Sequence, residues 1–184
     1  MHFWGNVIGN QLVWFCAVAG AGRGQYWPAV LAATAYIVSQ LLLSAHPSVE
    51  LKLMAVAIVC GLLVDGVAGA SGLVVYAAGT PAAWLAPVWI LALWASFAMT
   101  LTVSFAALQR QWRLAALVGL LLAPLAYLSA ARGFSSVAFA TPAWRGIAVL
   151  GMGWSLALPA LAACARRWQR PYQRSARLQS GEGR

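Results

Sequence analysis

The stretch Cys60-Gly61-Leu62-Leu63-Val64-Asp65-Gly66-Val67-Ala68-Gly69 sets the first constraint on the fold, because it places a carboxyl group inside an apolar run. Asp65 is one of three acidic residues in the chain, and the other two, Glu50 and Glu182, lie outside this run. A carboxylate at the centre of a bilayer costs about 3 kcal/mol on insertion scales, so such a residue normally faces a bundle interior or a wet cavity. We therefore expect Asp65 to point away from lipid and to have polar partners.

The composition of the whole chain is that of a membrane protein. Of its 184 residues, 62% are hydrophobic and 8% are charged. Soluble domains are roughly half apolar and one quarter charged, so this chain has too few polar side chains to cover a soluble surface. Its length fits a single domain.

The net charge of +9 comes largely from the end of the chain, because six of the 12 basic residues follow position 165. No basic face with interleaved aromatic residues is apparent, so nucleic acid is not an expected partner. A basic segment beside a membrane span is typical of contact with anionic lipids. The predicted membrane-surface residues are Arg166, Arg167, Arg170 and Arg174.

Apolar segments predict six transmembrane helices, at about 3–21, 27–44, 51–70, 87–108, 114–131 and 147–163. The predicted fold class is thus an all-α integral membrane bundle. Residues 1–165 form the six-helix domain, and residues 166–184 form a basic cytoplasmic tail that we expect to be disordered from Pro171 onward.

The distribution of basic residues predicts how this bundle is oriented. With both termini inside, nine Lys and Arg residues fall on the inner side, and only Arg23, Arg132 and Arg145 fall on the outer side. Nine against three satisfies the positive-inside rule. We therefore predict a multi-pass membrane protein with both termini in the cytoplasm.

Two segments are ambiguous or unusual within this scheme. Gly66, Gly69 and Gly72 recur after Asp65, so the third helix either ends there with a glycine-rich exit or breaks and continues as a half-helix to Tyr76. In the fourth helix, hydroxyl groups recur at four-residue spacing and should share one face that is turned away from lipid. They belong to Ser96, Thr100 and Ser104.

Depth in the membrane predicts which polar groups meet. Tyr127 and Arg132 should lie at the depth of Asp65, so we expect Asp65 to pair with Arg132 or Arg23, or to accept a hydrogen bond from Tyr127. Alternatively, Asp65 stays protonated, because burial disfavours the charged form, and then serves as a proton relay. A separate polar patch is expected in the inner half, formed by Asn6, Asn10, Ser96, Thr100 and Ser104.

The sequence offers little support for an enzyme. It has no Ser-His-Asp set, no H-E-x-x-H motif, no paired carboxylates and no phosphate loop, which disfavours a hydrolase or a metalloenzyme. The three cysteines, Cys16, Cys60 and Cys164, stand alone in apolar segments, so we expect neither a metal site nor a cofactor.

An ordered set of motifs resembles a known family. The motifs are Asn10-Gln11-x-x-Trp14-Phe15, Asp65, Trp94-x-x-Phe97-x-x-Thr100-Leu101-x-x-Ser104, and Gly119-x-x-x-x-Pro124-x-Ala126-Tyr127 followed by Ala131-Arg132. They resemble small proteobacterial inner-membrane proteins grouped as domain of unknown function 2878, over nearly the whole chain except the arginine-rich tail. The resemblance implies no activity. It implies an association with genes for a cyclopropane-fatty-acid-synthase-like methyltransferase and a flavin-dependent amine-oxidase-like protein, which points to modification of membrane lipids.

Three hypotheses about function follow. In the first, the protein binds or passes a lipid-like small molecule in fatty-acyl modification, through Asp65, Tyr127 and Arg132, with Asn10, Thr100 and Ser104 lining the interior. In the second, it is the substrate-binding membrane subunit of a vitamin-type transporter. In the third, it is a non-catalytic assembly subunit that docks a membrane-protein partner, or a second copy of itself, through small-residue faces such as Gly5 and Gly9.

Overall fold

The computed structural model describes residues 3–79, 82 and 85–179, with side chains up to Tyr172. This part of the chain is all-α apart from one short strand pair. Its helices are α1 (Phe3–Ala21), α2 (Trp27–Leu43), α3 (Pro47–Ala70), α4 (Val88–Ala98), α5 (Trp112–Phe134) and α6 (Trp144–Gln179), with a 3-10 helix at Ala106–Arg110 and the strands β1 (Val74–Tyr76) and β2 (Val137–Phe139).

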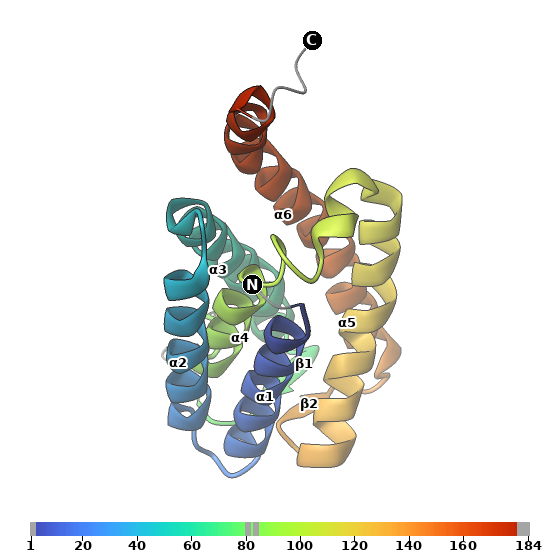
Figure 1. Cartoon of the computed structure of the whole chain (residues 1–184). Helices are drawn as coiled ribbons and strands as arrows, with labels where there is room; N and C mark the ends of the chain where they lie inside the picture. Colours follow the sequence, from blue (N-terminus) through green and yellow to red (C-terminus); the bar gives the residue numbers. More distant parts are fainter. Residues whose placement is uncertain (1–2, 80–81, 83–84, 180–184) are drawn as a thin grey trace.

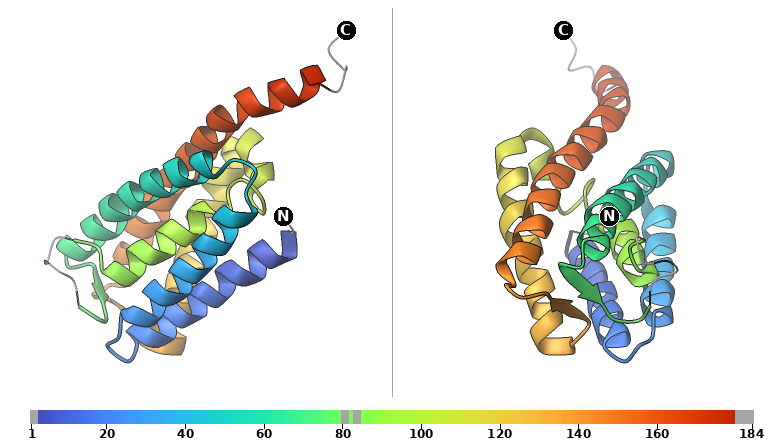
Figure 2. Two further views of the ribbon diagram at one scale, coloured as in Figure 1. Left: turned by 60° about the vertical axis from the view of Figure 1, so that its left-hand side comes forward. Right: turned by 180° about the vertical axis from the view of Figure 1, so that it is seen from behind.

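The helices form one bundle whose loops gather at two ends (Figure 1). One end holds the start of α1, the turn between α2 and α3, and the 3-10 helix. The opposite end holds the turn between α1 and α2 and both strands. α6 projects beyond the other helices at the first of these ends (Figure 2). The main packed helix pairs are α5 with α6, α1 with α2, and α3 with α4.

The surface of the bundle indicates a multi-pass membrane protein. α3, α5 and the Trp144–Tyr172 part of α6 are long and apolar enough to cross a membrane, and α2 and α4 are shorter apolar helices. Large apolar side chains lie on the outside, with Leu42 81% exposed and Leu156 75% exposed. Such side chains would be unfavourable in water over so large an area, and they are the side chains that face acyl chains in a bilayer.

The predicted fourth helix, 87–108, is wrong as a single helix. α4 ends at Ala98, and residues 99–105 turn before the 3-10 helix begins. Side chains from elsewhere satisfy the carbonyl groups that the break releases. Asn6 Nδ2 donates to the carbonyl of Met99 at 3.0 Å, and Gln109 Nε2 donates to that of Leu101 at 2.9 Å. Irregular backbone is tolerated at membrane depth where protein buries it in this way.

The glycine-rich segment after Asp65 is the end of α3, so the alternative of a half-helix reaching Tyr76 is wrong. α3 stops at Ala70, and Gly72 adopts a positive φ of 70°, which favours glycine. The chain then enters β1, which pairs antiparallel with β2, Val74 opposite Phe139 and Tyr76 opposite Val137. This strand pair fixes the position of Tyr76 beside α3.

The chain after Ala165 differs from the expected disordered tail, because α6 continues to Gln179. Arg, Gln, Ala and Leu are good helix formers, and they extend a helix that is already nucleated. Arg166, Arg167 and Arg170 are exposed along it, and Arg174 belongs to the same helix. The ring of Tyr172 stacks on His46 with the ring centroids 3.9 Å apart, which ties this extension to the turn before α3.

Candidate functional site

The carboxyl group of Asp65 is completely buried and receives three hydrogen bonds. Tyr127 Oη donates to Oδ1 at 2.5 Å, and Tyr76 Oη donates to the same oxygen at 2.8 Å. Trp94 Nε1 donates to Oδ2 at 2.7 Å. We call Asp65, Tyr76, Trp94 and Tyr127 the carboxyl cluster. Three neutral donors replace the water that a carboxyl group would lose on burial.

Each donor of the carboxyl cluster comes from a different element, so the complete tertiary fold is needed to assemble it. Trp94 lies on α4 against Gly61, one turn before Asp65 on α3, where an added Cβ would collide with the indole ring. Tyr76 is held by the β1–β2 pairing, and Tyr127 projects from α5. Burial raises the pKa of the Tyr76 phenol, and the adjacent Asp65 carboxyl raises it further. Tyr76 therefore keeps its proton and acts as a donor.

Of the predicted partners of Asp65, Tyr127 is confirmed and the arginines are wrong. Arg132 and Arg23 are both exposed, and neither reaches the carboxyl group, whose hydrogen-bond partners in the described residues are the cluster's three donors. The reason is helix geometry. Arg132 follows Tyr127 by five residues, which turns it about 140° around α5 and away from α3. The prediction of Arg132 as a partner rests on its depth in the membrane, and depth alone does not determine which face of the helix a residue occupies.

A second group of polar side chains surrounds Asn6, which is 1% exposed. Its Nδ2 lies 2.9 Å from Tyr36 Oη and 2.8 Å from Gln40 Oε1, both on α2. Ser104 Oγ donates to Asn6 Oδ1. We call Asn6, Tyr36, Gln40 and Ser104 the amide cluster. The contact of Asn6 with Ser104 confirms part of the predicted inner patch.

The other hydroxyl groups of that patch satisfy their own helix instead. Ser96 Oγ donates to the carbonyl of Leu93 at 3.0 Å, and Thr100 Oγ1 donates to that of Phe97 at 2.6 Å. Such bonds to the preceding turn are the usual way for Ser and Thr to be satisfied in an apolar helix. The four-residue spacing therefore did not produce one continuous hydroxyl face.

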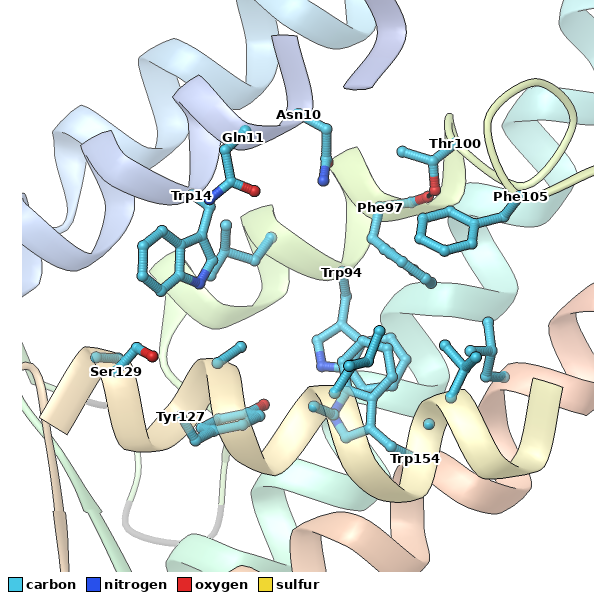
Figure 3. Close-up of a pocket in the computed structure, with 18 of the residues that line it drawn as sticks. Asn10, Gln11, Trp14, Trp94, Phe97, Thr100, Phe105, Tyr127, Ser129 and Trp154 are labelled. Carbon is cyan, nitrogen blue, oxygen red and sulfur yellow. Dashed lines mark hydrogen bonds between the residues drawn. The ribbon is translucent and has the colours of Figure 1, made fainter. Parts of the chain in front are cut away.

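A cavity of about 550 Å³ lies between the two clusters. Its walls come from α1, α4, α5 and α6, and most of the side chains in them are apolar or aromatic. Trp94 and Tyr127 of the carboxyl cluster line one part, and Thr100 lines another (Figure 3). Ser104 of the amide cluster is also a lining residue. Asn10 projects into the space from α1, opposite Tyr127 and Trp154 (Figure 3). The cavity thus joins groups that we expected to form separate sites.

Some of the predicted site residues line the cavity and others lie outside it. Asn10, Thr100, Ser104 and Tyr127 all line this cavity. Asp65 lies behind the wall, bonded to Trp94 and Tyr127, and Arg132 is not among the lining residues.

Residues with no role predicted from the sequence complete the site. They are Tyr76 and Trp94 on the carboxyl group, Trp154 stacked on Trp94, and Tyr36 and Gln40 around Asn6. One signal could have found the two tryptophans. Trp94 and Trp154 lie well inside apolar segments, whereas Trp in a membrane protein is enriched at the two interfaces. A Trp at depth needs an acceptor for its N–H, and Asp65 is the one acid inside an apolar run.

A comparison with protein families gives one match. The family model, described as a protein of unknown function (DUF2878), matches residues 3–160. The chain belongs to the DUF2878 family. Comparisons of this DUF2878 protein with curated proteins and with solved structures find no significant match. The matched range includes both clusters and every residue that lines the cavity, and it ends within α6 before Arg166.

Proposed function

We propose that this DUF2878 protein binds or passes a lipid-like molecule in the cavity between α1, α4, α5 and α6. The cavity itself carries the proposal. Ligand sites are typically concave, about 300–1,000 Å³ in volume and mostly apolar, with a few placed polar groups. The cavity has about 550 Å³, apolar walls and the polar side chains of Asn10, Thr100 and Ser104.

The side chains at the edge of the cavity support entry from the bilayer. Phe3 on α1 is 48% exposed and Leu122 on α5 is 55% exposed, and both line the cavity. Exposed apolar surface on a membrane helix faces acyl chains. A molecule dissolved in the bilayer would therefore meet the cavity between α1 and α5 without crossing water.

In this proposal Asp65 is a positioning residue. It does not line the cavity, but its two oxygens hold the side chains of Trp94 and Tyr127, which do. The carboxyl group thus determines the shape of the wall. Fatty-acyl or membrane-lipid modification is the pathway that we propose. Its support is the association with genes for lipid-modifying enzymes that the family resemblance implies.

We further propose that all six helices span a bacterial inner membrane, with both termini in the cytoplasm. Support comes from the gathering of loops at two ends of the bundle and from the exposed Arg166, Arg167 and Arg170 at one of them. These arginines would bind anionic lipid headgroups. α1 is not among the long apolar candidates because Asn6, Asn10 and Gln11 lower its hydropathy, and Asn6 is buried.

The two other hypotheses receive less support. A vitamin-type ligand is water-soluble and would need more polar walls than this cavity has. A docking subunit would need the small-residue face of α1 to be free, but part of this face already packs against α2. A Cβ added at Gly9 would lie 2.7 Å from the Tyr36 ring, whereas one at Gly5 would meet nothing within 4 Å.

Filling the cavity tests the proposal. Ala126 lines the cavity from α5, and its neighbour Leu125 is 56% exposed outside it. Native mass spectrometry of protein released directly from membranes should detect a retained lipid on the wild type and on Leu125→Trp. Ala126→Trp should retain about tenfold less, equivalent to about 1.4 kcal/mol. Equal retention by all three proteins, or no lipid on the wild type, would refute binding in this cavity.

A further inference from the structure

The walls of the cavity carry no charge. None of the described residues that line it is Asp, Glu, Lys or Arg. The nearest carboxyl group, that of Asp65, is fully buried behind Trp94 and Tyr127, and both its oxygens already accept hydrogen bonds. A phosphate, sulfate or carboxylate that entered the cavity would lose its hydration and gain no counter-charge, which is strongly unfavourable.

The cavity does contain hydrogen-bond donors without acceptors. Trp154 lines it, and the buried Nε1 of Trp154 has no hydrogen-bond partner among the described residues. This N–H lies near the Tyr127 hydroxyl but outside hydrogen-bond geometry. An indole N–H can only donate, and no acceptor among the described residues meets hydrogen-bond geometry with it, so a molecule in the cavity could supply the acceptor. Buried donors of this kind are rare in native structures and call for an explanation.

The direction of the Trp154 N–H is fixed by packing. Its ring stacks on Trp94 with centroids 3.9 Å apart and an interplanar angle of 17°, and it meets Phe97 edge-on at 5.3 Å. Trp94 is in turn held by Asp65. The carboxyl cluster therefore presents a rigid donor to the cavity, and rigid donors bind a ligand with little loss of conformational freedom.

A second donor faces the cavity from α1. The side-chain amide of Asn10 lines the cavity and makes no hydrogen bond within the described part of the chain. The hydroxyl groups of Thr100 and Ser104 are already committed as donors, to the carbonyl of Phe97 and to Asn6. Asn10 and Trp154 thus offer free N–H groups on opposite walls (Figure 3).

From these contacts we infer that the ligand is an uncharged lipid-like molecule whose polar group is a carbonyl acceptor, as in an ester or a ketone. The carbonyl oxygen accepts a hydrogen bond from Trp154 Nε1, Asn10 provides the second donor, and the hydrocarbon chain packs along Val7, Val118 and Leu122. This inference rests on the proposed function, because it names the chemical class that the same cavity takes.

Three probes with the same chain length test the inference on the full-length protein in detergent micelles. Methyl palmitate carries the acceptor, hexadecane carries none, and hexadecyl sulfate carries a permanent negative charge. Occupancy at equimolar probe is measured by native mass spectrometry. The wild type should hold methyl palmitate more than hexadecyl sulfate by at least tenfold. Trp154→Phe should lower methyl palmitate occupancy about fivefold, the effect of one neutral hydrogen bond, and leave hexadecane occupancy unchanged.

Matched variants separate recognition from folding. Trp144→Phe changes the same residue type on α6 at an exposed position outside the cavity and should change no occupancy. Asn10→Leu removes the donor on α1 and should lower occupancy by methyl palmitate alone, whether or not Trp154→Phe folds. Hexadecyl sulfate bound as well as methyl palmitate, or equal losses of methyl palmitate and hexadecane in both cavity variants, would overturn the inference but not lipid binding. A wild type that binds none of the three probes would overturn the proposed function as well.

Discussion

At the scale of single residues, Asp65 shows how a membrane bundle keeps a carboxyl group without an ion pair. Buried ion pairs carry a large desolvation penalty for both partners. Here one buried group is solvated by two phenols and one indole, all of them side chains that are themselves largely apolar. The donors add aromatic surface to the core while they satisfy the carboxyl oxygens.

Replacing Asp65 by Asn should destabilise the protein. An Asn side chain presents an NH₂ group to at least one donor of the carboxyl cluster, so a buried polar group loses its partner. We expect a loss of about 1–3 kcal/mol in the free energy of unfolding, seen as a lower Tm in detergent by intrinsic fluorescence. Arg132→Gln is the control, and it should leave Tm unchanged because Arg132 is exposed and does not contact Asp65. The reverse result, a stable Asp65→Asn and an unstable Arg132→Gln, would contradict this account and support an ion pair between Asp65 and Arg132.

At the scale of elements, the break after α4 depends on amide side chains supplied by other segments. Asn6 from α1 and Gln109 from the 3-10 helix donate to carbonyl groups that a continuous helix would have satisfied itself. Gln109 also donates to Gln169 of α6 at 3.0 Å, so it connects the break to the last helix. The turn at residues 99–105 is therefore a supported part of the cavity wall, to which it contributes Thr100, Ser104 and Phe105.

Removing the amide of Gln109 should weaken this turn specifically. Gln109→Leu leaves the Leu101 carbonyl without its donor, and we expect a destabilisation of about 1–3 kcal/mol. Hydrogen–deuterium exchange should show faster exchange in residues 99–105. Gln111→Leu is the matched control, because Gln111 is exposed two residues away and makes no side-chain hydrogen bond that involves the turn. Unchanged exchange in Gln109→Leu would mean that the break is held by packing alone.

At the scale of the whole molecule, the bundle has two ends with different character. The end that we place in the cytoplasm carries the extension of α6 with its exposed arginines. The other end carries the strand pair, which closes the bundle beside the carboxyl cluster. The cavity lies between them, and its lining residues include Phe3 of α1 and Leu122 of α5, both exposed.

The proposed orientation predicts which loops are reached from each side of the membrane. Single cysteines at Gln25 and Gln111, both exposed, should react oppositely with an impermeant thiol reagent once the three native cysteines are replaced. In intact cells Gln25→Cys should be labelled, and Gln111→Cys should be labelled only after lysis. Labelling of Gln111→Cys alone in intact cells would invert the topology, and labelling of both would reject the six-span arrangement.

The sequence by itself determined the all-α membrane class and the burial of Asp65, and it offered Tyr127 as one of three alternative partners. The class and the burial follow from short stretches of sequence, because the cost of placing each residue in lipid depends on that residue and its near neighbours along the helix. The short length of residues 137–139 and 74–76 hid the strand pair, since neither segment can be recognised as a strand without the other.

Only the tertiary structure decided where the helices break and what forms the site. Trp94 lies 29 residues from Asp65 in sequence, Tyr127 lies 62 away, and the donor to the Met99 carbonyl lies 93 away at Asn6. Hydrophobic periodicity gives each helix a buried face, but the partner of a buried polar atom depends on which faces meet in the folded bundle. The cavity and its unpaired donors, Trp154 Nε1 and the Asn10 amide among them, arise from that packing, and they are what indicate a ligand.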